Sequence, residues 1–364
     1  MSDYIGVSLF SGAMGLDIGL EQAGVDIRVC QDFDKACYNT MIANGKNAMT
    51  GDIKEISSDD ILSKAGVNKE DVFLLCGGPP CQPFSTAGRR GGVNDPRGSL
   101  FMDYMRILRD IKPRFAVFEN VKGLLSTKHD GRPVIDIILD EFHNAGYKTV
   151  HGLLDAVHYG VPQFRERVIV IASRDNEDIF LPMPTHFMVH QNIDYRWSTL
   201  RSVISDLENT PGDYVPFSAD RLRYLQMVPE GGNWRDLPPE IQPVAMGGAW
   251  ESGGGKVGFY RRLSYSQPSP TVVTSPVQKA TMMCHPTQDR PLSVKEYARI
   301  QQFPDDWVVT GTITERYRQI GNAVPVGLAR AIGSAIIATA EGTAVVKTKR
   351  TRGTSVHKLQ DKAV

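Results

Sequence analysis

Short apolar runs alternate with helical patterns through the first half of this chain. Runs with the length of buried strands occupy residues 5–10, 27–30, 72–76 and 115–118, and a later one occupies 168–172. Segments with apolar residues at helical spacing separate the earlier runs and occupy residues 16–23, 35–43 and 99–111. Because strands and helices alternate, the pattern predicts an α/β fold with a doubly wound, mostly parallel sheet.

The pattern changes after about residue 181, where Pro and Gly are frequent and helical periodicity is scarce. Ser293 and Glu296 then form a capping-box pattern that opens a helix, and a final helix is predicted from 325 to about 340. We therefore expect a discontinuous larger domain, a smaller irregular domain inserted into it, and a basic, disordered tail. The expected limits are 1–180 plus 310–340 for the larger domain, 181–309 for the smaller domain and 341–364 for the tail.

The composition is that of an ordinary soluble globular protein, with 41% hydrophobic and 23% charged residues among 364. We expect no apolar stretch long enough to span a membrane. The five cysteines include no Cys-x-x-Cys pair, so no zinc site is expected, and without an export signal they favour a reducing cytoplasm. The formal net charge of +0 neither requires nor excludes nucleic acid, because basic groups can gather on one face.

Cys81 follows Gly-Gly-Pro-Pro at the end of the apolar run 72–76. Glycines and prolines end a strand abruptly, so the pattern favours an exposed thiol nucleophile over the buried position typical of a free cysteine. Glu119 likewise follows the run 115–118, and ligands of open α/β sheets bind at the carboxyl ends of strands. Taken alone, Glu119 is also compatible with a strand cap or a surface ion pair.

A glycine-containing turn at 10–16 joins the first predicted strand to the first predicted helix. Glycines let a ligand approach the backbone, and a helix N-terminus favours a negative group. Asp32 lies at the end of the second predicted strand, where an acidic side chain can bind the hydroxyls of a ribose. This pattern alone does not distinguish a ligand site from an ordinary strand–turn–helix connection.

Four motifs in this order resemble those of DNA (cytosine-5) methyltransferases of the bacterial or phage modification-enzyme type. They are Pro79-Pro80-Cys81-Gln82-Pro83-Phe84-Ser85, Glu119-Asn120-Val121, Gln163-Phe164-Arg165-Glu166-Arg167 and Gly321-Asn322-Ala323-Val324-Pro325. The resemblance implies a class I, Rossmann-like methyltransferase with a smaller target-recognition domain. Its implied reaction moves a methyl group from S-adenosylmethionine to carbon 5 of a flipped cytosine in double-stranded DNA.

The resemblance also implies residue roles. Cys81 would attack carbon 6 of the base, Glu119 would protonate or hydrogen-bond its ring nitrogen 3, and Arg167, supported by Arg165, would stabilise its oxygen 2. The implied cofactor-binding residues are Phe10, Gly12, Gly15, Leu16, Asp32, Phe33, Asp52, Ile53, Pro80, Asn322 and Val324. Met14 stands where the family more commonly has a second glycine, which leaves the shape of this turn open.

The segment 82–98 is basic, rich in glycine and next to the predicted nucleophile. This composition and position predict a lid that closes on DNA. The implied DNA-contacting residues are Ser85, Arg89, Arg90, Arg97, Trp234 and Arg235. The tryptophans of the inserted domain could equally pack a small core. We further expect a cytoplasmic monomer, associated with the nucleoid when bound to DNA, with a companion restriction endonuclease as its functional partner.

Two other functions remain open on the sequence. A tRNA cytosine methyltransferase of the same fold would use the same chemistry, but its characteristic Cys-Phe-Thr stretch is not found, since His285 and Pro286 follow Cys284. A non-catalytic DNA-binding relative would be expected to lose the thiol or the carboxyl, and both are present at Cys81 and Glu119.

Overall fold

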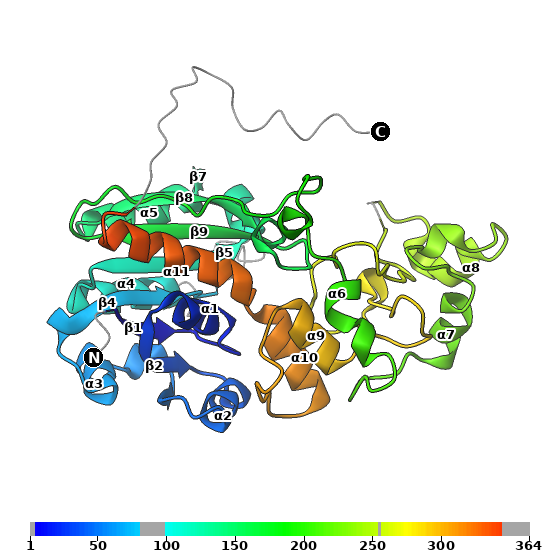
Figure 1. Ribbon diagram of the computed structural model, residues 1–364, viewed down its shortest axis with the longest axis horizontal. Coiled ribbons are helices and arrows are strands. Elements are labelled where there is room, and N and C mark those ends of the chain that lie inside the picture. The colour runs from blue at the N-terminus through cyan, green and yellow to red at the C-terminus, as the bar shows by residue number, and fades with distance from the viewer. Residues whose placement is uncertain (1–3, 81–98, 254–255, 344–364) are drawn as a thin grey trace, which may run out of the picture.

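A seven-stranded sheet forms the centre of the larger lobe (Figure 1). The computed structural model describes residues 4–80, 99–253 and 256–343. Along the sheet the order is β3-β2-β1-β4-β5-β9-β8. The strands span Ile5–Leu9 (β1), Asp26–Asp32 (β2), Ala48–Thr50 (β3), Val72–Gly77 (β4), Phe115–Val121 (β5), Lys148–Asp155 (β8) and Glu166–Ser173 (β9). The first five pair in parallel, and β9 runs antiparallel to both β5 and β8, so the predicted fold class is confirmed.

Helices cover both faces of this sheet. They span Gly15–Ala23 (α1), Lys35–Ala43 (α2), Ser58–Ala65 (α3), Ser99–Ile111 (α4), Val134–Asn144 (α5) and Val326–Ala340 (α11). Buried residues of α3, α4 and α5 pack with one face of the sheet, and those of α1 and α11 pack with the other. A Cβ atom on Gly19 would lie 2.4 Å from the Val326 carbonyl oxygen, so α1 and α11 approach closely because this residue is glycine.

The smaller lobe contains short helices joined by irregular segments (Figure 1). The helices are α6 (Arg201–Ile204), α7 (Ala219–Leu225) and α8 (Gln242–Met246), and α9 (Val294–Ile300) and α10 (Ile313–Asn322) lead back to α11. The lobe has a core of its own that includes Leu225, Leu237 and Cys284. Tyr297 and Ile300 of α9 instead share a cluster with α1 and α2. The limits of the two domains therefore remain a prediction, with α9 packed on the larger lobe.

The segment Ile313–Ala340 is long and apolar enough, by length and composition alone, to cross a membrane. The expectation that no stretch reaches this length was therefore wrong for one segment. The segment is divided into α10 and α11 around Pro325, and 61% of its most apolar window is buried inside the protein. Its apolar character is explained by packing, because α11 lies against α1 in the core.

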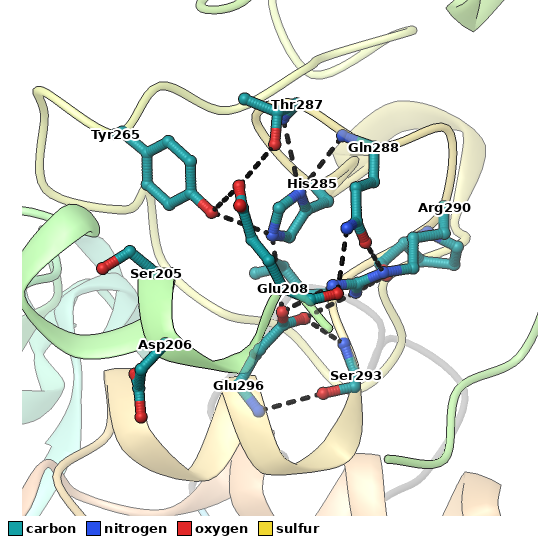
Figure 2. Close-up of polar contacts among 12 residues, drawn as sticks. Ser205, Asp206, Glu208, Tyr265, His285, Thr287, Gln288, Arg290, Ser293 and Glu296 are labelled. Carbon is teal, nitrogen blue, oxygen red and sulfur yellow. Dashed lines mark hydrogen bonds and ion pairs between the residues drawn. The ribbon is translucent and has the colours of Figure 1, made fainter. Parts of the chain in front are cut away.

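A buried ion pair anchors the start of α9 (Figure 2). Arg290 donates from both terminal nitrogens to the two carboxylate oxygens of Glu296, each at 2.8 Å. The backbone N–H of Ser293 also donates to Glu296, which completes the predicted capping box. Glu296 has no exposed surface, so its charge depends on these partners.

His285 extends the same network toward the interior of the smaller lobe (Figure 2). Its Nδ1 accepts the backbone N–H groups of Thr287 and Gln288, so the ring proton lies on Nε2, between Tyr265 and Glu296. Burial lowers the pKa of His285 to about 4, which keeps the ring neutral at physiological pH. The network therefore contains one pair of opposite charges, on Arg290 and Glu296, and one neutral imidazole, on His285.

Replacing Glu296 with Gln should destabilise the protein strongly. The amide keeps the shape and an oxygen for the Ser293 N–H, but it leaves Arg290 buried without a counter-charge. Breaking one partner of a buried pair typically costs about 3–5 kcal/mol. Urea unfolding followed by circular dichroism measures the loss.

Glu315→Gln is the matched control, since Glu315 forms the same capping box with Thr312 at the solvent-facing start of α10. Its unfolding midpoint should stay close to that of the wild type. Equal losses in the two variants would show that the capping geometry, and not the buried charge pair, stabilises α9.

Candidate active site

A single cavity of about 950 Å³ opens at the carboxyl ends of β1, β2, β4 and β5. All the predicted cofactor residues line it: Phe10, Gly12, Gly15, Leu16, Asp32, Phe33, Asp52, Ile53, Pro80, Asn322 and Val324. Glu119, Arg165 and Arg167 line the same cavity. The structure thus gathers residues that are more than 300 positions apart in the sequence into one site.

The turn between β1 and α1 presents its backbone to this cavity. Gly12 adopts a left-handed conformation, with φ of 55°, and its N–H donates to Asp32 at 2.8 Å. Met14 also has positive φ, 70°, so it takes the conformation that glycine would supply at the start of α1. Its side chain is fully buried, and this packing offsets the strain of the backbone. The replacement of the commoner glycine therefore leaves the turn intact.

Residue 15 must be small for the cavity to close on its C-terminal side. A Cβ atom on Gly15 would lie 2.2 Å from the carbonyl oxygen of Val324. Real Cβ atoms do not approach an oxygen so closely, so glycine permits contact between the start of α1 and the turn before α11. The first and last predicted cofactor segments thereby become neighbours.

Asp32 is held in place by two backbone N–H groups. Gly12 donates to one carboxylate oxygen and Asp34 donates to the other, each at 2.8 Å. Burial raises the pKa of Asp32 above its usual value, although these hydrogen bonds oppose the rise. Each oxygen keeps a lone pair for a further donor, as the two hydroxyls of a ribose require. The neighbouring Phe33 is 73% exposed, so its ring is available to a flat ligand.

Arg318, on α10, also lines the cavity. Its guanidinium lies 2.6 Å from the carboxylate of Asp34, which also caps α2 through the Ala36 N–H. The sequence reasoning missed Arg318, although its position four residues before Asn322 on one helix is a usable signal. The pair links the β2–α2 turn to the segment that carries Asn322.

Glu119 and Arg167 form an ion pair inside the cavity. Nε of Arg167, on β9, lies 2.7 Å from Oε1 of Glu119, on β5, and both side chains are nearly buried. Burial raises the pKa of Glu119, while Arg167 and, more weakly, Arg165 oppose this rise. A Cβ atom on Gly78 would lie 2.6 Å from Oε2 of Glu119, so the glycine after β4 makes room for this carboxyl.

The contacts of Arg165 differ from the prediction, which gave this residue a supporting role at the substrate. Only 1% of it is exposed, and its terminal nitrogens donate to the carbonyl oxygens of Val272 at 2.9 Å and Gly321 at 2.7 Å. Its guanidinium is thus occupied by backbone carbonyls from two distant segments. Of the two predicted arginines, Arg167 is the one placed against Glu119.

Asn120 fixes the backbone that leads to the predicted nucleophile. Its side-chain amide donates to the carbonyl oxygen of Pro79 at 2.9 Å, which joins the end of β5 to the segment after β4. Cys81 itself lies outside the described residues, as do the predicted DNA contacts Ser85, Arg89, Arg90 and Arg97. Pro80, the residue before Cys81, lines the cavity.

Trp234 and Arg235 lie in the smaller lobe and do not line this cavity. The Arg235 guanidinium lies 5.0 Å above the Trp234 ring, and the ring of Trp250 meets Trp234 edge-on at 5.6 Å. No His, Cys, Asp or Glu cluster suited to a metal ion occurs among the described residues. The structure therefore brings the predicted cofactor residues together with Glu119, Arg165 and Arg167, and keeps the predicted smaller-lobe contacts apart from them.

Asp17 is a second cavity residue that the sequence reasoning missed. It lies in the first turn of α1 with no exposed surface, and neither carboxylate oxygen has a hydrogen-bond partner in the described part of the chain. A charged residue inside the apolar stretch 16–20 is the signal that could have revealed it.

Comparison with known proteins finds relatives of one family that match nearly the whole chain. Residues 4–338 match the family model of C-5 cytosine-specific DNA methylases. The type II methyltransferase M.Sau96I of Staphylococcus aureus is 39% identical over 92% of this chain and 76% of its own length. M.PspPI of Psychrobacter sp. is 41% identical over 92% and 79%, and M.Eco47II of Escherichia coli is 37% identical over the same shares.

Solved structures share the fold at lower identity. A prophage-encoded protein of E. coli described as a DNA modification methyltransferase superposes with a TM-score of 0.67 at 22% identity, covering 93% of this chain and 99% of its own. The S. pombe Dnmt2 methyltransferase gives 0.59 at 20% identity, covering 92% and 98%. With the family model spanning the cavity and both lobes, the chain belongs to the C-5 cytosine-specific DNA methylases and is a DNA cytosine-5 methyltransferase.

Proposed function

We propose that the enzyme transfers a methyl group from S-adenosylmethionine to carbon 5 of a cytosine flipped out of one short double-stranded DNA sequence, through a covalent adduct with Cys81. The observation that carries this proposal is the cavity that joins the β1–α1 turn to the Glu119–Arg167 pair. A methyl donor and a base bound there would share the same space. The Glu119–Arg167 end also offers both an acid and a cation to a pyrimidine.

The residues present fit S-adenosylmethionine. Asp32 is oriented for two hydroxyl donors, Phe33 offers an exposed ring to a purine, and Asp52 and Ile53 lie beside them. Gly12, Gly15 and the N-terminus of α1 let the other end of the molecule approach the backbone. When bound, S-adenosylmethionine supplies an electrophilic methyl group on a sulfonium.

The roles of the protein groups follow from the low nucleophilicity of carbon 5 of cytosine. It is a poor nucleophile because it belongs to an aromatic ring, and addition of the Cys81 thiolate to carbon 6 removes that aromaticity. Glu119, whose pKa is raised by burial, can hold a proton at ring nitrogen 3. Arg167 stabilises the negative charge that reaches oxygen 2. After methylation, loss of the carbon 5 proton and expulsion of Cys81 restore the ring.

Recognition is assigned to the smaller lobe within 181–309, with Trp234 and Arg235 as candidate base or phosphate contacts and the segment 82–98 as a lid. Phosphate contacts position a protein on DNA, whereas base contacts specify the sequence. The relatives named as type II methyltransferases support a place in a restriction–modification system, with a companion endonuclease. We also propose that the enzyme is a cytoplasmic monomer.

Cys81→Ser should abolish methyl transfer to DNA while cofactor binding persists, because the hydroxyl is a far weaker nucleophile than the thiolate. DNA carrying 5-fluorocytosine at the target should be trapped covalently by the wild type, since fluorine cannot leave as a proton does. Gel electrophoresis and peptide mass spectrometry locate the adduct. Normal turnover by the serine variant, or an adduct at another residue, would contradict the mechanism.

Arg167→Met should lower turnover by about 100-fold or more, the usual effect of removing one charge-stabilising donor. Loss of this neighbouring cation should raise the pKa of Glu119 further, which moves the alkaline limb of the pH–rate profile to higher pH. Steady-state kinetics and ¹³C NMR titration of the Glu119 carboxyl measure both effects.

Lys122→Met provides the control for this change, because Lys122 forms a largely exposed ion pair with Glu166 at the start of β9. Turnover and the Glu119 titration should be unaffected in this variant. A normal rate in Arg167→Met would remove Arg167 from the proposed chemistry.

Grafting residues 181–274 into a relative of different specificity should transfer the recognised sequence with the segment. Bisulfite sequencing of DNA from cells expressing the chimera identifies the methylated sites. An active chimera that kept the recipient's specificity would show that recognition lies elsewhere.

A further inference from the structure

Arg318 meets the turn that follows β2 from a helix near the other end of the chain. It lies on α10, where the smaller lobe joins the larger one (Figure 1). Its side chain lines the cavity together with Phe33 and Asp34. Nη2 of Arg318 lies 2.6 Å from Oδ2 of Asp34, a residue 284 positions earlier in the sequence. The ion pair therefore joins two parts of the cavity wall that the sequence keeps far apart.

Asp34 connects this ion pair to the residues proposed to hold the adenosine part of the cofactor. Its backbone N–H donates to Oδ1 of Asp32 at 2.8 Å, and its own Oδ1 accepts the N–H of Ala36. Phe33 lies between the two aspartates in the chain, and its exposed ring lines the cavity. Fixing the side chain of Asp34 therefore fixes the backbone on which the positions of Asp32 and Phe33 depend.

The charge of Arg318 also offsets the acidic character of this part of the cavity, which Asp32, Asp34 and Asp52 line. Burial raises the pKa of Asp32; the charge of Asp34 adds to the rise, and Arg318 opposes it. A cation paired with Asp34 thus favours the ionised form of Asp32. That form acts only as a hydrogen-bond acceptor, as two hydroxyl donors require.

Other contacts already hold α10 against α2. The Thr40 hydroxyl donates to the side chain of Gln319 at 2.7 Å in a buried contact, and it accepts the backbone N–H of Thr310 at 3.0 Å. The Arg318–Asp34 pair is partly exposed, and such pairs add little to the stability of a fold. Its effect is therefore expected in ligand binding more than in unfolding.

We propose that Arg318 is a positioning residue of the cofactor site, which through its ion pair with Asp34 holds Asp32 and Phe33 in place for the adenosine part of the ligand. The proposal rests on the proposed use of S-adenosylmethionine. Because S-adenosylmethionine and S-adenosylhomocysteine share the adenosine part, the pair strengthens the binding of both to the same extent. It leaves the chemical step unchanged, since Arg318 is bound to Asp34 and not to the Glu119 carboxyl.

Arg318→Met should weaken the binding of S-adenosylmethionine and of S-adenosylhomocysteine by about fivefold each, the effect of one partly exposed ion pair. Isothermal titration calorimetry on the full-length enzyme measures both affinities. In steady-state kinetics the KM for S-adenosylmethionine should rise by a similar factor, while kcat at saturating cofactor is kept. Arg318→Lys retains the cation and should recover most of the affinity.

Arg316→Met is the matched control for the loss of an arginine from this helix. Arg316 lies two residues earlier on α10, pairs with Asp213 at 2.9 Å and does not line the cavity. The affinity of this variant for both ligands should match that of the wild type. A loss equal to that of Arg318→Met would show that any weakening of α10 reduces binding, and would overturn the positioning role.

Asp34→Asn tests the pair from its other side and serves if Arg318→Met does not fold. Asn caps a helix as well as Asp does, so the contact to Ala36 can persist while the ion pair is lost. This change should weaken both ligands as Arg318→Met does. The double variant should bind no more weakly than either single variant, because the same interaction is lost in each.

Three results would overturn the proposal: unchanged affinity in either single variant, a loss confined to one of the two ligands, or additive losses in the double variant. A fall in kcat with an unaltered KM would do the same. Failure of the wild type to bind S-adenosylmethionine at all would instead contradict the proposed function.

Discussion

The site depends on a network of buried side chains that joins four distant parts of the chain. Gln163 donates to the Gln301 side chain at 2.9 Å and accepts the backbone N–H of Val272 at 2.9 Å. Arg165, two residues on, donates to the carbonyls of Val272 and Gly321. The turn before β9, the segment around Val272, the end of α9 and the end of α10 are thereby fixed together. Because these groups are buried, breaking any of their hydrogen bonds would be costly, so the geometry is strongly determined.

This hydrogen-bond network explains how Arg167 reaches Glu119. With Arg165 tied to carbonyls on one side, β9 begins in a fixed register, and Val121 of β5 pairs with Arg167. The side chain of Arg167 then meets Glu119 across the antiparallel pair at 2.7 Å. The Gln-x-Arg-x-Arg pattern therefore has two parts: Gln163 and Arg165 hold distant segments together, and Arg167 pairs with Glu119 inside the cavity.

The strands and most of the cavity could be predicted because their signals are local. Uninterrupted apolar runs identify β4 and β5, and residues at the carboxyl ends of such strands must converge. Lys148–Asp155 was missed as a strand because this edge strand is mostly half-exposed and its sequence lacks clean alternation. The partners of Arg165 could not be predicted, since they are backbone carbonyls more than 100 residues away, one in an irregular segment and one at the end of α10.

The distribution of charge gives the cavity two chemically different ends. Glu119 lies with two arginines, so this end stays net positive whether or not the carboxyl is ionised. Asp17, Asp32 and Asp52 line the end formed by β1, β2 and the segment after β3, where Arg318 is already paired with Asp34. On the proposed function, a base that gains negative charge would be favoured at the first end and a sulfonium at the second. The difference in charge between the two ends would then help to orient the two proposed reactants.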